Sequence, residues 1–212
     1  NKGLWGYKRA KKHYGTPYKG SKNQIVDFIV SHIPVTENFY DLFAGGCAIT
    51  HKVIEESKYK RYFANDIDGE GIELFWDSIH GKYTLDNQIE WVSREDFYKL
   101  KDTNPYIKYC WSFGNNGRDY LYGKDIEEYK KAWDYAIFKN DYSLSKELGF
   151  DLSSTNEIKD KYQKYLVTKK IIIEIKKKDE KLQNLERCTR LERLQSLQSL
   201  QSLQSLQSLQ SL

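Results

Sequence analysis

The sequence predicts an α/β protein built on a parallel sheet. Short apolar runs alternate in the first half of the chain with segments of helical periodicity, a glycine pair follows the first run, and an acid ends the second. Strands that alternate with helices pair in parallel, because each helix carries the chain back across the sheet. We expect strands over residues 38–43, 62–66 and 89–92.

Apolar residues that recur at helical spacing predict the helices. We expect them over residues 25–33, 48–57, 70–79, 126–137 and 156–181. Ser21 and Gln24 form a plausible capping box for the first, and Pro34 would end it. Ser154 and Glu157 would open the last.

A change of composition marks the middle of the chain. From Tyr106 onward the sequence is rich in glycine, asparagine and aromatic residues, as in YCWSFGNNGRDYLYGK. Asn116-Gly117 between aromatic runs predicts a β-hairpin, since both central residues of its tight turn need a positive φ. Asn104-Pro105-Tyr106 is expected to form a turn.

The C-terminal segment is a triplet repeat. Leucine falls at every third position from Leu182 to Leu212, with Cys188 filling one gap. On an α-helix each triplet turns the leucine stripe back by about 60°, and a flat strand needs a period of two. A small solenoid, a long helix with a winding stripe and disorder all remain open. We interpret the segment as a spacer or interaction arm.

The N-terminal segment is basic although the net charge is only +4. Between Asn1 and Val26 there are seven basic residues and no acid. Such an arm suits a phosphate backbone, but it is equally typical of a solvated tail. Interleaved aromatics slightly favour a docking surface. The candidate nucleic-acid contacts in the arm are Lys8, Arg9, Lys11 and Lys12.

Cysteine usage and hydropathy exclude several classes of protein. The three cysteines are widely spaced and form no CxxC or His/Cys cluster, which argues against a disulfide framework and structural zinc. No metal is expected. No stretch approaches the length of a membrane span and no signal peptide is visible, so a cytoplasmic protein is expected. The chain lacks methionine and stops within its repeat, which predicts a fragment.

Two sites at the ends of adjacent predicted strands indicate a ligand. Asp41 to Gly46 contains a glycine turn directly after a strand, where the backbone can approach a ligand closely. Asp66 ends the next strand, 21 residues beyond Gly45. An acid at roughly this offset reaches ribose hydroxyls in nucleoside-binding units. A tight turn with a helix N-cap at Asp66 is the alternative.

A third segment, Tyr18 to Lys22, places a glycine, lysines and an expected helix N-terminus together. Helix N-termini attract carboxylates through free N–H groups and the helix dipole. The carboxylate of an amino-acid ligand such as S-adenosylmethionine would fit this segment. We therefore expect Lys22, Gly45 and Asp66 to surround one cavity.

With these motifs the chain resembles the Dam-like class of DNA adenine methyltransferases, in versions common in phages and restriction systems. The resemblance covers roughly residues 14–140. It rests on TPYKGSK (16–22), YDLFAGG (40–46), FANDID (63–68), WSFGNNGRDYLYGK (111–124) and, more loosely, SREDF (93–97). It implies a Rossmann-like S-adenosylmethionine-dependent methyltransferase sheet with a helical and hairpin DNA-recognition insertion, followed by the leucine-triplet repeat.

The resemblance also implies roles for individual residues. Tyr18 and Lys22 would contribute to cofactor binding from the N-terminal segment, and Asp66 would bind the ribose. The glycine turn would cradle the methionine moiety, and an acid-Phe pair would lie by the adenine. The turn residues are Asp41, Phe43, Ala44 and Gly45, and the pair is Asp96 and Phe97. An ordinary helix cap at Ser93 and Asp96 is the alternative for the pair.

The implied partner is double-stranded DNA in a bacterial or phage-infected cell; the oligomeric state stays open. The implied DNA contacts are Asn116, Arg118 and Lys124, which would reach phosphates or guanine edges, and Tyr120 and Tyr122, which with Trp111 would stack or wedge. The alternative is a hairpin whose aromatics pack on the core. We expect a cofactor-binding part over 1–105, a recognition part over 106–181 and the repeat over 182–212.

The family's catalytic signature is an Asp or Asn, two prolines and an aromatic residue. This chain has only Pro17, Pro34 and Pro105, and no Pro-Pro pair. The polypeptide by itself is therefore not expected to methylate DNA. A non-catalytic DNA-binding module and a repeat-mediated interaction protein are the alternative functions.

Overall fold

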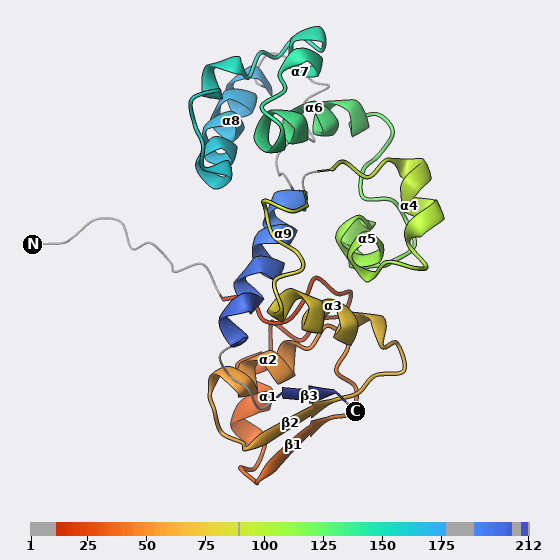
Figure 1. Cartoon of the computed structure of the whole chain (residues 1–212), viewed down its shortest axis with the longest axis vertical. Coiled ribbons are helices and arrows are strands. Elements are labelled where there is room, and N and C mark those ends of the chain that lie inside the picture. The colour runs from red at the N-terminus through yellow and green to blue at the C-terminus, as the bar shows by residue number, and fades with distance from the viewer. Residues whose placement is uncertain (1–11, 89, 177–188, 205–208, 212) are drawn as a thin grey trace, which may run out of the picture.

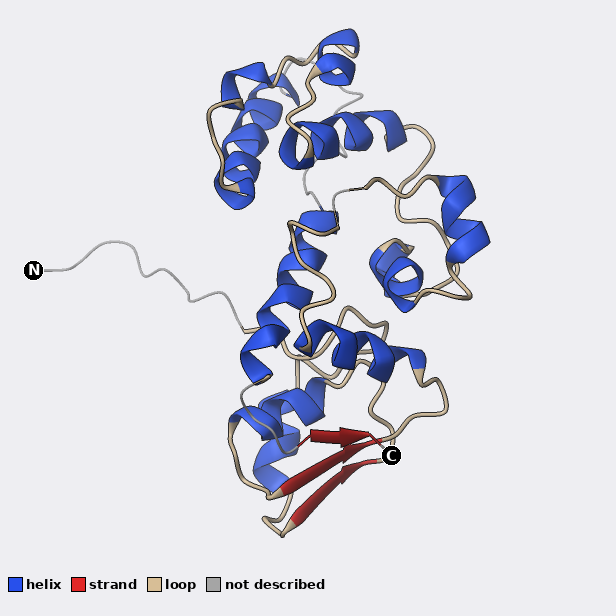
Figure 2. Ribbon diagram, in the orientation of Figure 1, coloured by secondary structure: helices blue, strands red, loops and turns tan. Residues whose placement is uncertain are grey.

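A small parallel sheet lies at one end of the molecule and a group of helices at the other (Figures 1 and 2). The computed structural model describes residues 12–88, 90–176, 189–204 and 209–211. The sheet contains β1 (Asn38–Asp41), β2 (Arg61–Ala64) and β3 (Leu209–Ser211), paired in parallel in that order. The predicted parallel sheet is thus present among these residues, although its third strand comes from the end of the chain.

The first two strands form where the short apolar runs predict them. Phe39 pairs with Tyr62, and both side chains are buried. Tyr40 and Phe63 point to the opposite face, where their rings stack with centroids 4.6 Å apart. Alternate residues of a strand face opposite sides of a sheet, so one face of β1 and β2 builds the core.

Three helices belong to this part of the chain: α1 (Val26–His32), α2 (Ala48–Glu55) and α3 (Glu70–Ile79). α2 packs against β2, and α1 packs against α2. They confirm the first three predicted helices to within a few residues. The capping box predicted for the first is wrong, because α1 begins after Ile25 without a side-chain cap. Ser21 and Lys22 therefore precede the turn at residues 23–25 and do not lie at the helix N-terminus.

The third predicted strand is wrong. Residues 90–92 form no strand, and Ile89 lies outside the described residues. Trp91 instead stacks on Tyr122, with centroids 5.4 Å apart, and packs edge-on against Trp111. Aromatic packing therefore takes precedence over strand pairing for this apolar run.

The middle of the chain is helical. It contains α4 (Arg94–Leu100), α5 (Pro105–Cys110), α6 (Glu127–Phe138), α7 (Ser143–Glu147) and α8 (Lys161–Lys176). The turn expected at residues 104–106 is wrong, because Asn104 caps α5 by accepting the Ile107 N–H at 3.2 Å, and Pro105 occupies the first turn. α6 confirms its prediction, whereas α8 begins at Lys161 and not near Ser154.

The predicted hairpin is reduced to a single antiparallel bridge between Ser112 and Tyr120. Asn116 has a φ of −84°, so it does not adopt the left-handed conformation that the predicted turn requires. Its side-chain oxygen accepts the backbone N–H groups of Arg118 and Asp119, at 2.8 and 3.0 Å. This local hydrogen bonding builds a different turn.

The described part of the triplet repeat belongs to the fold. Residues Thr189–Ser199 form α9 and Leu200–Leu203 continue as the 3₁₀-helix η4, both packed against α3. The five leucines at 191, 194, 197, 200 and 203 are at most 4% exposed. Tightening to three residues per turn eclipses residues three apart, so η4 keeps its leucines on one face. The spacer and solenoid interpretations are wrong for these residues.

Two buried arginines join α9 to the helical part. The Arg190 Nη1 donates to both carboxylate oxygens of Asp134 on α6, at 2.6 and 2.7 Å. Arg193 donates to the carbonyl oxygens of Cys110 and Ser112, at 2.5 and 3.0 Å. In Figure 1, α9 runs from the sheet end toward α6 and α8. It is therefore the element that connects the two ends of the molecule.

Candidate functional site

The site begins where β1 and β2 end. The Ala44 N–H donates to the Asn65 carbonyl at 3.0 Å, and the Asn65 N–H donates to the Asp41 carbonyl at 2.8 Å. Gly45 has a φ of +50°, which favours glycine, and its N–H donates to the Asp66 carboxylate at 2.8 Å. The glycine turn and the acid of the second strand are thus held together.

A segment before α1, residues 15–22, covers the glycine turn, and we call it the covering segment. The Thr16 N–H donates to the Gly46 carbonyl at 2.8 Å. The Tyr18 ring lies against Gly45, and a Cβ added to Gly46 would come within 2.5 Å of the Tyr18 Cβ. No larger residue fits at Gly46, so the glycine pair permits this close approach.

These parts surround one cavity of about 220 Å³, which we call the strand-end cavity. Lys22, Gly45 and Asp66 all line it, as the sequence predicts. Tyr18, Phe43 and Ala44 line it as well, so six of the nine predicted cofactor residues come together. The lining also includes Lys19, Gly20, Ser21, Gly46, Ala48 and Ile49.

The polar groups of the cavity are partly engaged by the backbone. The two carboxylate oxygens of Asp66 accept the N–H groups of Gly45 and Asp68, at 2.8 and 3.0 Å. Each carboxylate oxygen can accept more than one hydrogen bond, so Asp66 keeps capacity for hydroxyl donors. Lys22 is exposed and donates to the Gly20 carbonyl at 2.9 Å. Phe43 is 90% exposed at the cavity, an unusual environment for a large apolar ring.

Asp41 does not line the strand-end cavity. Its carboxylate accepts the Thr50 hydroxyl at 2.7 Å and ties the end of β1 to α2. Burial raises the pKa of Asp41, while hydrogen bonds from Thr50 and the Phe43 backbone oppose this rise. Its position is that of a structural link beneath the turn.

Asp96 and Phe97 also lie away from this cavity. Ser93 caps α4 by accepting the Asp96 N–H at 3.1 Å, so the helix-cap alternative is confirmed. Phe97 is fully buried, with its ring centroid 5.7 Å from that of Tyr120. The structure therefore does not bring this pair to the strand-end cavity, and its place beside the cofactor stays a prediction.

Ala48 and Ile49 are lining residues that the sequence reasoning missed. They form the first turn of α2, directly after the glycine turn. The helix that follows such a turn starts at the ligand in nucleotide-binding α/β units, which is the signal that could have found them. Tyr109 was also missed; its ring packs on Tyr18 at 5.2 Å and its hydroxyl donates to Asp68 at 2.6 Å.

The predicted DNA contacts divide into two groups. Arg118 and Lys124 are exposed, whereas Tyr120 and Tyr122 are buried, so the alternative in which the aromatics pack on the core is confirmed. The Asn116 side chain is used within its own turn.

The contacts predicted in the basic arm are only partly described. Lys12 forms an ion pair with Glu55 on α2, so its positive charge is already paired within the protein. The other three, Lys8, Arg9 and Lys11, lie outside the described residues.

A larger cavity of about 410 Å³ lies between the start of α4 and helices α6 and α7. Lysines and acids are mixed in its lining, which includes Lys124, Lys131, Asp125 and Glu128. It contains no residue of the glycine turn. Its mixed charge favours no single class of ligand, so it adds nothing to the strand-end cavity.

Two kinds of feature are absent from the described residues. No cluster of three or more His, Cys, Asp or Glu side chains that could hold a metal ion occurs among them. In the same part of the chain, none of the helices combines the length and apolar character that crossing a bilayer requires.

An acid and a glycine turn that share a cavity at the ends of parallel strands are typical of α/β proteins that bind nucleosides. Comparison with known families shows which family of such proteins the chain belongs to. The model of the D12 class N6 adenine-specific DNA methyltransferases matches residues 18–198, and the chain belongs to that family. No curated protein and no solved structure matches it.

Proposed function

We propose that the strand-end cavity binds S-adenosylmethionine, the methyl donor for the family's reaction at the N6 of adenine in DNA. The supporting observation is that Lys22, Gly45 and Asp66 surround one cavity although they lie on three separate segments. Sugar hydroxyls suit the free acceptor capacity of Asp66. The carboxylate of the methionine moiety suits the lysines of the covering segment.

The size of the cavity limits what it can hold. At about 220 Å³ it is smaller than the roughly 300–1,000 Å³ typical of sites that enclose a whole ligand. We therefore expect it to enclose the methionine moiety and the ribose, with the adenine extending over the exposed ring of Phe43. Stacking on an aromatic face would stabilise the base there.

We further propose that this polypeptide alone binds the cofactor without transferring the methyl group. The exocyclic amine of adenine is a poor nucleophile, and the Asp/Asn-Pro-Pro-aromatic signature supplies acceptors for its hydrogens and a ring for the flipped base. The 212 residues contain no Pro-Pro pair. The helical region of residues 106–181 would carry DNA contacts through exposed cations such as Arg118 and Lys124, within the bacterial cytoplasm.

Calorimetry with S-adenosylmethionine tests the proposal. Asp66→Ala should weaken binding by about tenfold to a hundredfold, since a hydrogen bond to a charged group contributes about 1.5–3 kcal/mol. Asp102→Ala is the matched control, because Asp102 is 72% exposed and lies outside the cavity lining. Unchanged affinity in Asp66→Ala, or no binding by the unmodified chain, would refute the assignment.

A further inference from the structure

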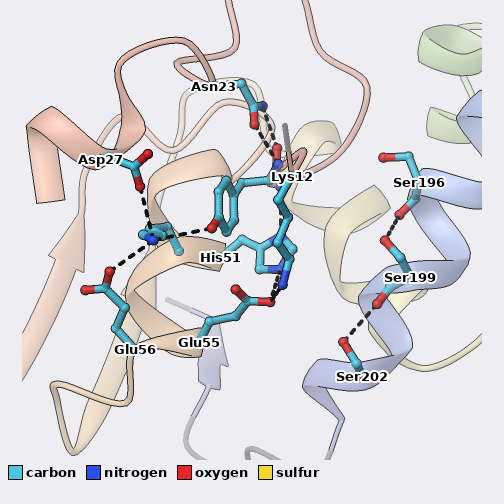
Figure 3. Close-up of polar contacts among 12 residues, drawn as sticks. Lys12, Asn23, Asp27, His51, Glu55, Glu56, Ser196, Ser199 and Ser202 are labelled. Atoms are coloured by element: carbon cyan, nitrogen blue, oxygen red, sulfur yellow. Dashed lines mark hydrogen bonds and ion pairs between the residues drawn. The ribbon is translucent and has the colours of Figure 1, made fainter. Parts of the chain in front are cut away.

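His51 lies on α2 beneath the segment that covers the strand-end cavity, without lining the cavity itself. Its side chain is 3% exposed. The Gly15 N–H donates to its Nδ1 at 2.9 Å, and its Nε2 lies 3.4 Å from the Glu55 carboxylate. Figure 3 shows Glu55 pointing toward both His51 and Lys12. The imidazole thus connects the covering segment to α2.

These contacts define the protonation of the ring. A ring nitrogen that accepts a hydrogen bond carries no proton, so the neutral form with its proton on Nε2 is the one that fits. The Nε2–H then faces Glu55, which fixes the orientation of the ring. The pKa of His51 is lowered to about 4, mainly by burial; Glu55 opposes this effect, and Lys12 and His13 add to it. The ring is therefore neutral near pH 7.

Gly15 lies between His51 and the glycine turn. Gly15 has a φ of +71°, and a Cβ added to it would lie 2.1 Å from the Gly46 carbonyl oxygen. The next residue, Thr16, donates its N–H to that same carbonyl oxygen. Two residues further on, the Tyr18 ring covers Gly45. A shift of Gly15 would therefore displace the Tyr18 wall of the cavity.

Hydrogen bonds between Tyr14 and Asn23 also join the two ends of the covering segment. The Asn23 side chain accepts the Tyr14 N–H at 2.6 Å and donates to the Tyr14 carbonyl at 2.7 Å, as Figure 3 shows in part. Residues 15–22 thus form a loop with joined ends. Within it, His51 supplies the side-chain contact from α2 that reaches the Gly15 backbone. The Tyr14 ring packs edge-on against His51, with centroids 5.2 Å apart.

We propose that His51 is a positioning residue for the strand-end cavity: its neutral Nδ1 holds Gly15, and so keeps Tyr18 and Lys22 in place over the glycine turn. The proposal rests on the proposed function for the identity of the ligand, S-adenosylmethionine. The geometry of the loop is independent of that identity. His51 is not a catalytic residue, because it touches neither the cavity nor the reacting atoms.

Two substitutions separate the acceptor from the bulk of the side chain. Asn places an acceptor oxygen near the position of Nδ1, whereas Leu fills a similar volume without any acceptor. His51→Leu should weaken S-adenosylmethionine binding by about tenfold, and His51→Asn should keep it within about threefold of the unmodified chain. Equal losses in both variants, or none in either, would overturn the proposal.

Hydrogen exchange provides a readout that does not depend on the ligand. The amides of Gly15 and Thr16 should exchange faster in His51→Leu and remain protected in His51→Asn. If the unmodified chain binds no S-adenosylmethionine while exchange follows this pattern, the proposed function fails and the positioning role stands. Should His51→Leu not fold, nitrogen NMR of the unmodified chain decides. A proton on Nδ1 of His51 near pH 7 would refute the role.

Discussion

The ion pair between Asp134 and Arg190 sets the largest stability change that we predict. Asp134→Leu would leave the Arg190 guanidinium buried beside the rings of Trp111 and Phe138, with 5.0 and 4.3 Å to their centroids. These rings do not replace a carboxylate. The variant loses two charge-assisted hydrogen bonds, and each contributes about 1.5–3 kcal/mol to the unfolding free energy. Breaking one partner of a buried pair costs about 3–5 kcal/mol of unfolding free energy.

Urea unfolding followed by tryptophan fluorescence measures this loss, since the Trp111 ring lies beside Arg190 and Trp133 precedes Asp134 on α6. The double variant Asp134→Leu/Arg190→Met should recover most of it, because removing both charges of a buried pair is often close to neutral. Asp86→Ala is the control; Asp86 is 88% exposed, and its pair with Lys161 should contribute less than about 1 kcal/mol. A loss below about 1 kcal/mol for Asp134→Leu would refute the reasoning.

Three further predictions concern the loop, the histidine and a helix cap. Gly15→Ala should lower the unfolding free energy by at least about 2 kcal/mol, because the added Cβ would overlap the Gly46 carbonyl oxygen. Gly20→Ala has a similar positive φ but meets no atom within 4 Å, so it should lose only about 1 kcal/mol. Equal losses in the two variants, measured by urea titration, would contradict this overlap. As the pH falls from 6.5 to about 4, the unfolded chain protonates His51 and the folded chain does not. Stability should therefore fall in this window by up to about 3 kcal/mol, and thermal unfolding of His51→Asn should lack that part. Asn104→Ala removes the cap of α5 and should cost about 1 kcal/mol in the same urea assay, with no change expected in cofactor binding.

The sequence predicts β1, β2, α2 and α3 well because each carries a local signal, a short apolar run for the strands and helical periodicity for the helices. It could not predict β3, since an LQS triplet has no strand periodicity and forms a strand only beside the open edge of β2. For the same reason α9 was ambiguous: its leucine stripe winds about the helix and is buried only because α3, α5 and η4 surround it. Tertiary contacts decide the conformation of such segments.

In the site, too, residues that depend on local sequence could be predicted, and residues that depend on tertiary contacts could not. Gly45 and Asp66 could be found because strand-end chemistry follows directly from strand order. The roles expected for Tyr120 and Tyr122 depended on exposure, and no pattern in the sequence distinguishes an aromatic that stacks on DNA from one in the core. His51 gave no signal, because its partner Gly15 lies 36 residues away and offers only a backbone N–H.

The origin of β3 in identical triplets has a consequence for how the tail can vary. Moving the chain along β2 by one triplet places the same letters opposite Tyr62 and on the same faces, because paired residues of neighbouring strands point to the same side of a sheet. Registers that differ by whole triplets are therefore equivalent. Tails that differ by three residues would present the same edge strand beside β2.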